Sequence, residues 1–273
     1  MARFQGLRRI CAALSVMAAA PLGAQAEEPL RLFGAGSLRE AMTEITGDYT
    51  ARTGQPVETS FGYSGLMRER IEAGEPADIF TSANMGHPEK LLAEGRAIRV
   101  EKFIRNSLCV VAQAGTGLSE ENVVGTLLDP ALTLGMFPAI QDPVGDYTLE
   151  LFDAIDAEQP GAGKTLRDRA VVIDKAMLGR PLAEGENLVV ALFHEGRMGV
   201  HVSYCSTARN RLAAQEPTLE IAPAPARFRV GPEYGLAILK DARPGTGDLE
   251  SYILSPDAEA TLVRHGFTAL APR

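Results

Sequence analysis

Short apolar runs alternate along this chain with stretches whose apolar residues recur at helical spacing. The run from Leu30 to Phe33 predicts a strand. The next apolar residues, Leu38, Met42, Ile45 and Tyr49, are three or four positions apart, which predicts a helix. The same alternation predicts further strands over residues 57–61, 77–81, 107–112, 132–136, 198–204 and 234–239, and helices over 62–72, 88–94, 143–155, 188–195, 249–254 and 256–265. This order of elements favours an α/β fold with a mostly parallel sheet.

The first 26 residues have the pattern of a secretory signal. Arg3, Arg8 and Arg9 precede an apolar run over residues 10–20, and Ala24-Gln25-Ala26 offers a cleavage site with small residues. The run is too short for a spanning helix, which needs about 20 apolar residues. We therefore expect an exported protein, placed in the periplasm and soluble after cleavage, because no later segment is long and apolar enough to cross a bilayer.

Removal of residues 1–26 leaves 247 of the 273 residues, beginning at Glu27. That length suits one large domain or two lobes of about 120 residues, each able to bury its own core. No internal repeat or low-complexity tract is present, and the Pro/Ala stretch from Ala222 to Ala226 is where we expect a flexible connection.

Charge and cysteine content narrow the function further. Without the signal, 24 basic side chains stand against 35 acidic ones, a net charge of −11. A general basic field for nucleic acid is therefore absent, and any anion must be held by local donors. The two remaining cysteines, Cys109 and Cys205, each lie in an apolar, strand-like segment. Two buried thiols and one disulfide are both compatible with this pattern.

Two predicted strand-to-helix turns carry a serine among glycines. They are Gly34-Ala35-Gly36-Ser37 and Gly62-Tyr63-Ser64-Gly65. Such a serine commonly caps its helix. It also stands beside the unpaired N–H groups and the positive end of the helix dipole, where anions bind. Because open α/β sheets bind ligands at the carboxyl ends of their strands, the two turns together indicate an anion site.

Enzyme chemistry finds little support in the same residues. The pair Gly34-x-Gly36 begins a dinucleotide fingerprint, but Arg39 replaces its third glycine, so a nucleotide-dependent enzyme remains only a weak alternative. Ser64 does not lie in a GxSxG elbow, and no histidine has a motif that would pair it with a serine. We expect a binding protein with no enzymatic activity and no cofactor.

Metal binding is also weakly indicated. The four histidines form neither an HxH nor an HExxH pattern. Tyr63, Tyr147 and Tyr204 leave a tyrosine-based ferric iron site as an alternative, although tyrosines more often complete a core with a hydrogen-bonded tip.

With the serine turns in view, the chain resembles the molybdate-binding proteins of ABC importers, which have the type II periplasmic binding fold. The resemblance spans essentially the whole mature chain and is most specific in its N-terminal half. The matching stretches are residues 33–38, 60–65, 71–83, 106–108, 142–147 and 202–204, and the closing Gly266-Phe267.

The resemblance implies two α/β lobes, each a mostly parallel sheet flanked by helices, that close on an oxyanion held by neutral donors. The implied boundaries are 27–107 and 230–273 for the first lobe and 108–229 for the second. Carried over by motif, the anion-binding residues are Ser37, Ser64, Val144, Glu186 and Tyr204. The two serines and the tyrosine would contribute hydroxyls. Backbone N–H groups would come from the two serines, from Val144 and from the region of Glu186.

Several residues depart from that family's pattern. Tyr63 replaces a small residue, and Asp146 and Glu186 place carboxylates beside the second-lobe donors, so their side chains must point away. His201 and Cys205 next to Tyr204 are also unusual.

The implied function is the capture of molybdate or tungstate by a monomer that delivers it to a membrane permease. Sulfate, phosphate and ferric iron remain alternative ligands. A regulatory effector domain would use the same fold, but the export signal and the missing DNA-binding segment argue against that class.

Overall fold

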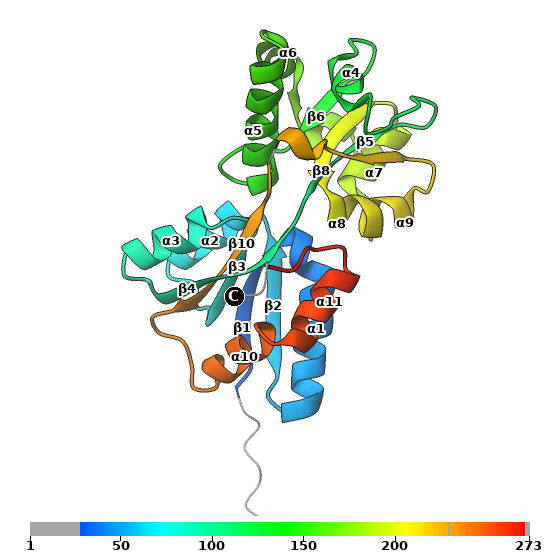
Figure 1. Ribbon diagram of the computed structural model, residues 1–273. Coiled ribbons are helices and arrows are strands. Elements are labelled where there is room, and N and C mark those ends of the chain that lie inside the picture. Colours follow the sequence, from blue (N-terminus) through cyan, green and yellow to red (C-terminus); the bar gives the residue numbers. More distant parts are fainter. Residues whose placement is uncertain (1–27, 229, 271–273) are drawn as a thin grey trace, which may run out of the picture.

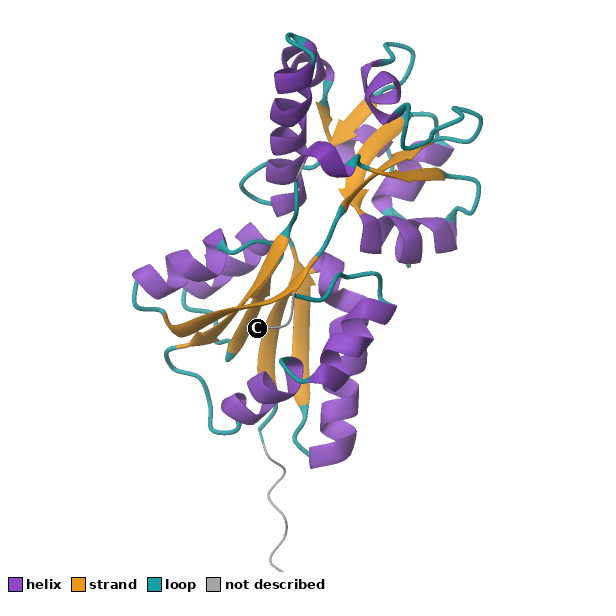
Figure 2. Cartoon of the chain, viewed as in Figure 1, coloured by secondary structure: helices purple, strands orange, loops and turns teal. Residues whose placement is uncertain are grey.

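The computed structural model describes residues 28–228 and 230–270, which form two lobes joined by two chain crossings (Figure 1). The predicted signal sequence, residues 1–26, lies outside the described residues. Each lobe has a five-stranded sheet with helices on both faces (Figure 2). The predicted α/β fold with two lobes is therefore confirmed.

The first lobe is built from both ends of the described chain. Its sheet has the order β2-β1-β3-β10-β4. The strands are β1 (Leu30–Ala35), β2 (Val57–Gly62), β3 (Ile79–Ser82), β4 (Ala97–Arg105) and β10 (Glu233–Leu239). The helices are the 3₁₀ turn η1 (Gly36–Leu38), α1 (Arg39–Thr53), α2 (Ser64–Glu72), α3 (Gly86–Ala93), α10 (Thr246–Ile253) and α11 (Pro256–Arg264).

Apolar side chains divide the helices of the first lobe between the two faces of its sheet. Met42, Ile45 and Tyr49 of α1 are buried with residues of α10 and α11 in one core. Met67 of α2 and Leu91 of α3 are buried in the core on the other face. The helical spacing seen in the sequence therefore corresponds to a buried helix face.

The second lobe is continuous in sequence. Its sheet has the order β7-β6-β8-β5-β9. The strands are β5 (Leu108–Ala112), β6 (Leu134–Met136), β7 (Val171–Val172), β8 (Val200–Tyr204) and β9 (Glu220–Pro223). The helices are α4 (Val123–Leu128), α5 (Pro143–Glu158), α6 (Ala162–Arg169), η2 (Lys175–Leu178), α7 (Leu188–His194), α8 (Cys205–Thr207), the π-helical turn η3 (Ala208–Leu212), α9 (Ala213–Gln215) and η4 (Ala226–Phe228).

Both sheets are mixed, so the expectation of mostly parallel sheets is wrong. In the first lobe β1 pairs in parallel with β2 and β3, whereas β10 is antiparallel to β3 and β4. In the second lobe β6 is parallel to β7 and β8, whereas β5 is antiparallel to β8 and β9. The antiparallel strands β4, β5, β9 and β10 flank the two crossings between the lobes, where the chain leaves one sheet and enters the other.

Several elements of the second lobe, among them α4, α6 and β7, were not predicted, and two further segments differ from the sequence-based expectation in an informative way. Strand β4 was not predicted, because its charged residues hide the apolar pattern; it is an edge strand, where charged side chains are tolerated. The stretch from Ala222 to Ala226 is not simply a flexible connection. Ala222 and Pro223 belong to edge strand β9, which pairs with β5, and Ala222 is buried. A proline is compatible with an edge position because no inward N–H is lost.

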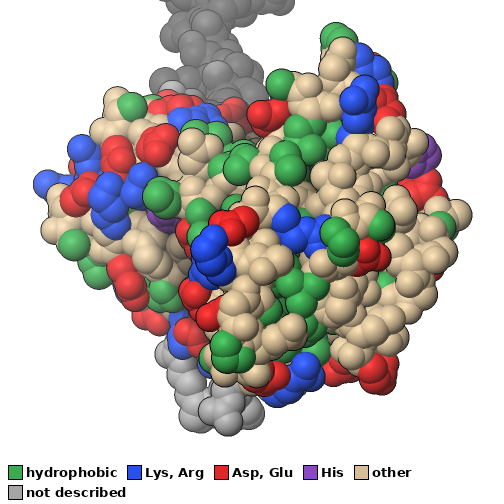
Figure 3. Space-filling view, turned by 90° about the horizontal axis from the view of Figure 1, so that it is seen from above, with side chains coloured by type: hydrophobic (Ala, Val, Ile, Leu, Met, Phe, Trp, Pro, Cys, Tyr) green, Lys and Arg blue, Asp and Glu red, His purple; other side chains and the backbone are tan. Residues whose placement is uncertain are grey.

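The surface seen from above mixes acidic and basic side chains rather than gathering one sign (Figure 3). None of the helices among residues 28–228 and 230–270 combines the length and the apolar character needed to span a bilayer.

A disulfide joins Cys109 of β5 to Cys205, the residue that follows β8. The two Cα atoms are 4.8 Å apart. The sequence left a thiol pair and a disulfide open, and the structure resolves this in favour of the bond. It closes a loop that contains most of the second lobe but not β9.

We expect the double substitution Cys109→Ala/Cys205→Ala to lower the free energy of unfolding by about 2–5 kcal/mol, because the unfolded chain gains freedom. Urea unfolding with and without a reductant measures this. The reductant should destabilise the wild type and leave the variant unchanged; equal sensitivity of both proteins would contradict the assignment.

His201 is fully buried in β8, and its Nδ1–H donates to the carbonyl oxygen of Gly135 at 3.1 Å. Burial lowers the pKa of this imidazole to about 4, since the charged ring would lose its hydration. Phe137 packs edge-on against the ring at 5.3 Å between centroids. His201 is thus a neutral core residue.

The low pKa of His201 makes stability depend on pH. The unfolded imidazole has a pKa of about 6.5, so between about pH 6.5 and 4 only the unfolded chain binds this proton. The contribution of the neutral His201 to the free energy of unfolding is complete above about pH 6.5. It falls by about 3 kcal/mol as the pH is lowered to 4. Urea unfolding at about pH 7 and pH 4.5 should show a smaller pH effect in His201→Gln than in the wild type. Identical losses would refute this role.

Candidate functional site

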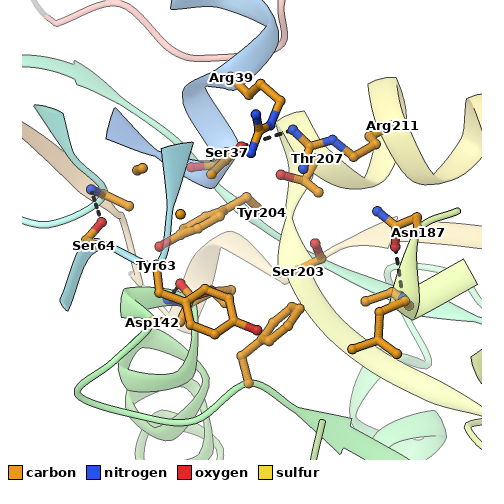
Figure 4. A pocket seen from close by; sticks show the side chains of 18 of the residues that line it. Ser37, Arg39, Tyr63, Ser64, Asp142, Asn187, Ser203, Tyr204, Thr207 and Arg211 are labelled. Atoms are coloured by element: carbon orange, nitrogen blue, oxygen red, sulfur yellow. Dashed lines mark hydrogen bonds between the residues drawn. The ribbon is translucent and has the colours of Figure 1, made fainter. Parts of the chain in front are cut away.

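A cavity of about 300 Å³ lies between the lobes, at the ends of β1 and β8 and at the starts of α2 and α5 (Figure 4). The first lobe supplies the two serine turns. The second lobe supplies the first residues of α5, the segment before α7 and the end of β8. The polar side chains in its lining are Ser37, Arg39, Tyr63, Ser64, Asp142, Lys175, Asn187, Ser203, Tyr204, Thr207 and Arg211.

The lobes touch on two sides of this cavity. On one side the N–H of Gly65 donates to the carbonyl of Gln141 at 2.9 Å. A Cβ at Gly65 would lie 2.7 Å from the carbonyl oxygen of Ile140, so this close approach requires glycine. On the other side Arg211, in the π-helical turn, pairs with Glu40 at 2.6 Å and donates to the carbonyl of Gly36 at 3.0 Å. The described conformation is therefore closed around the cavity.

Ser64 is the first residue of α2, where backbone N–H groups have no intrahelical partner. Its Oγ accepts a hydrogen bond from the N–H of Ala83 at 3.1 Å. The oxygen is thus engaged from the sheet side, and the hydroxyl hydrogen stays free to donate into the cavity.

Ser37 is oriented through a longer hydrogen-bond network. Its Oγ lies 2.9 Å from the hydroxyl of Tyr234 on β10. That hydroxyl accepts from the Nδ2 of Asn106 at 3.2 Å, so its own hydrogen is available to Ser37. Asn106 lies between β4 and β5, where the chain crosses from one lobe to the other. The Ser37 hydrogen is then left for the cavity, and its direction is tied to the crossing.

Tyr204 ends β8 and is 4 % exposed, and its hydroxyl, although it lies beside that of Tyr234, makes no hydrogen bond of full geometry to a described residue. Burial raises the pKa of this phenol, so it remains protonated and able to donate. Its ring packs edge-on against Tyr234 and Tyr147, at centroid distances of 5.7 and 6.4 Å. A buried hydroxyl held in this way and left unpaired is unusual in a folded protein and indicates a ligand position.

Val144 lies at the predicted place in the cavity lining, near the start of α5. Its backbone N–H is not free, however, because it donates to the Oδ1 of Asp142 at 3.2 Å. Asp142 is the N-cap of this helix, and an aspartate followed by a proline at a helix start is a recognisable capping signal. The sequence stretch was noted, but the place of the Asp142 carboxyl in the cavity was missed.

Burial raises the pKa of Asp142 to about 7, against the lowering effect of its bond from Val144. The side chain is half-buried and lines the cavity. None of the described cations forms an ion pair with it.

Glu186 is the one predicted residue that the structure does not bring to the cavity lining. Its N–H donates to the carbonyl of Ala183 at 3.1 Å, and its carboxylate pairs with Arg180 at 2.6 Å. The following residue, Asn187, lines the cavity and caps α7 through a 2.9 Å bond from the N–H of Val189. The structure thus brings to the cavity the residue next to the one expected from spacing, because an irregular loop precedes α7.

The other departures from the family pattern have separate roles. Tyr63 lines the cavity beside Phe137, with 5.8 Å between the ring centroids, and burial raises its pKa to about 12. The Oδ1 of Asp146 accepts from the N–H of Ile140 at 2.9 Å, and this residue is not part of the lining. Two of the carboxylates that could oppose an anion, those of Asp146 and Glu186, are therefore turned away, whereas Asp142 is not.

Three cations also line the cavity. Arg211 is engaged with Glu40, as described above, and Arg39 lies over the ring of Phe61 and donates to its carbonyl at 3.2 Å. Lys175 begins the short turn η2 and is exposed. The three named inner donors, two serine hydroxyls and one tyrosine hydroxyl, are neutral.

Known proteins resemble this chain over both lobes. A profile of the family described as bacterial extracellular solute-binding proteins matches residues 30–268. The uncharacterized protein PM1146 of Pasteurella multocida is 32% identical over 76% of this chain and 86% of its own length. The molybdate-binding protein ModA of Escherichia coli is 28% identical over 89% of this chain and 90% of its own.

Solved structures share the fold. The periplasmic molybdate-binding protein of Azotobacter vinelandii superposes with a TM-score of 0.71 at 18% identity, over 89% of this chain and all of its own. The sulfate-binding protein SubI of Mycobacterium tuberculosis gives 0.73 at 17% identity, over 90% and 88%. Iron-bound HitA of Pseudomonas aeruginosa gives 0.63 at 12% identity, over 89% and 90%. On the profile match across both lobes and the relative at 32% identity, this chain belongs to the family of bacterial extracellular solute-binding proteins.

Proposed function

We propose that this protein captures a small tetrahedral oxyanion, with molybdate or tungstate as the first candidates, and delivers it to the permease of an ABC importer. The observation that carries the proposal is the buried hydroxyl of Tyr204, which makes no hydrogen bond of full geometry to a described residue and lines the cavity between the lobes. An oxyanion would supply the missing acceptor.

The two serines support the same ligand class. Each hydroxyl oxygen is already engaged, by Ala83 in one case and Tyr234 in the other, so each can offer its hydrogen to the cavity. Three convergent neutral donors suit an anion that is rich in acceptors. The choice of molybdate or tungstate draws on relatives named as molybdate-binding proteins, while a sulfate binder shares the fold equally well.

Ferric iron is the less favoured alternative. Burial raises the pKa of its predicted tyrosine ligands, to about 12 for Tyr63 and Tyr147 and well above the usual range for Tyr204, so the bound ion itself would have to drive their ionisation. Tyr147 does not line the cavity. Within the part of the chain that the structure describes, no group of three or more His, Cys, Asp or Glu side chains is placed to hold a metal ion.

In this proposal the protein acts in the periplasm as a monomer, without a cofactor or a chemical step. The lobes, residues 27–107 with 230–273 and residues 108–229, open and close by a hinge at the two crossings. Ligand favours the closed form because Ser37 and Ser64 belong to one lobe and Tyr204 to the other.

Calorimetric titration with molybdate, tungstate, sulfate and phosphate tests the proposal. We expect one-to-one binding of molybdate or tungstate, weakened by about 1–3 kcal/mol in Ser37→Ala and in Ser64→Ala, because each loses one buried donor. Ser251→Ala, an exposed serine on α10, is the matched control. If folded, ligand-free protein binds none of the four anions, the proposed ligand class is refuted. If both serine variants bind the anion as tightly as the wild type, the proposed site is refuted.

Two tyrosine variants separate a ligand donor from a structural hydroxyl. Tyr204→Phe should weaken anion binding by about 1–3 kcal/mol while leaving the ligand-free protein equally or more stable, since it removes an unpaired buried hydroxyl. Tyr234→Phe should lower the free energy of unfolding by about 1 kcal/mol, because the Nδ2 of Asn106 loses one of its two acceptors and keeps the other, the Oγ of Ser206. Thermal unfolding with and without ligand measures both effects. A Tyr204→Phe protein that loses stability but binds normally would contradict this division.

A further inference from the structure

A carboxyl group in the wall of an anion pocket is an apparent contradiction, and Asp142 presents it. Its Oδ1 accepts the N–H of Val144, the backbone donor that the start of α5 offers to this cavity. The carboxylate thus occupies, from within the protein, the kind of position that a bound anion takes at a helix N-terminus. A charged carboxylate and a dianion would repel each other strongly in this enclosed space.

The surroundings do not relieve that repulsion. The titratable groups that interact electrostatically with Asp142 are Asp146 on its own helix, Tyr63 before α2, Tyr204 on β8 and Tyr234 on β10. The carboxyl of Asp146 adds negative charge, and the three phenols are neutral. The cations of the cavity lining, Arg39, Lys175 and Arg211, form no ion pair with Asp142 in the described structure.

A single proton resolves the conflict. A protonated Asp142 keeps Oδ1 for the N–H of Val144 and gains an O–H that can donate to the anion. Alternatively, a ligand that carries its own hydrogen, such as monohydrogen phosphate, can donate it to the ionised carboxylate. A fully ionised oxyanion beside an ionised Asp142 has neither option. The unpaired hydroxyl of Tyr204, which lines the same cavity, places the ligand beside these groups.

We propose that Asp142 is a specificity-determining residue of this pocket, which takes its anion together with one proton, held either by the carboxyl or by the ligand. The inference rests on the proposed function. Fully ionised anions such as molybdate and sulfate then bind with uptake of a proton from solution. Anions that bring a hydrogen, such as phosphate, bind without that requirement, and the site favours them as the pH rises.

The expected direction follows from proton linkage. The pKa of Asp142 in the ligand-free protein is about 7, and a bound dianion raises it. Above about pH 7 the affinity for molybdate should therefore fall by up to about tenfold per pH unit, because the proton must be acquired on binding. Below that pH the carboxyl is already protonated, and the affinity should level off.

The test compares the wild type with Asp142→Asn by calorimetry, using molybdate and phosphate at about pH 6, 7.5 and 9, in two buffers of different ionisation enthalpy. Asparagine caps helices as well as aspartate does, so α5 should stay intact while the titration is removed. Asp146→Asn is the matched control, because this carboxyl lies on the same helix outside the cavity lining.

We expect wild-type protein to take up a proton with molybdate and to lose affinity toward pH 9. Asp142→Asn should show no uptake and bind molybdate at least tenfold more tightly than the wild type at that pH. Phosphate should lose no affinity at high pH in the wild type and should bind more weakly to the variant. Asp146→Asn should keep the wild-type slope.

The outcomes distinguish this inference from the proposed function. Strong molybdate binding with the same pH slope in wild type and Asp142→Asn would overturn the role of Asp142 and leave the oxyanion function standing. Molybdate binding by the variant alone, or phosphate binding by the wild type alone, would support the inference. If neither the wild type nor Asp142→Asn binds molybdate or phosphate, the inference is overturned together with the oxyanion function on which it rests.

Discussion

The two serine hydroxyls in the pocket each have one hydrogen to give, and the fold fixes its direction by engaging the oxygen from behind. Ser64 receives the N–H of Ala83, which follows β3, and Ser37 receives the hydroxyl of Tyr234 on β10. Tyr204 is held by burial and by the edge-on packing of its ring against Tyr147 and Tyr234. Since these supports belong to the sheets rather than to mobile loops, the donors are oriented before a ligand arrives. Little ordering is then left for the binding step, which favours affinity.

The same constraint explains how an acidic chain can hold an anion. Residues 27–273 carry a net charge of −11, and the cations near the cavity are largely occupied, Arg211 by Glu40 and Arg39 by Phe61. The field inside the pocket is therefore set by hydroxyl and helix dipoles, and by one carboxyl whose charge depends on a proton. If Asp142 acts as proposed, the pocket discriminates between anions by the hydrogens they carry as well as by their size.

Local chemistry made part of this site predictable from sequence. Ser37 follows β1 and Ser64 follows β2 in glycine-containing turns, and the parallel pairing of β1 with β2 brings both turns to one edge. Asn187 rather than the expected Glu186 lines the cavity, because that position was counted across an irregular loop. Strand β4 was missed because charged residues mask its pattern. The disulfide and the role of Asp142 depend on distances between segments far apart in the chain, which no local pattern contains.

The position of β10 has a consequence for how the protein is made. This strand lies between β3 and β4, yet it comes from the last part of the chain (Figure 1). The polypeptide appears with its N-terminus first. The contiguous second lobe can therefore complete its sheet while β3 and β4 still expose unpaired edges. The lobe that is started first is therefore finished last. A chain that stalls before Glu233 leaves an unfinished first sheet, and that sheet is the part most prone to aggregate.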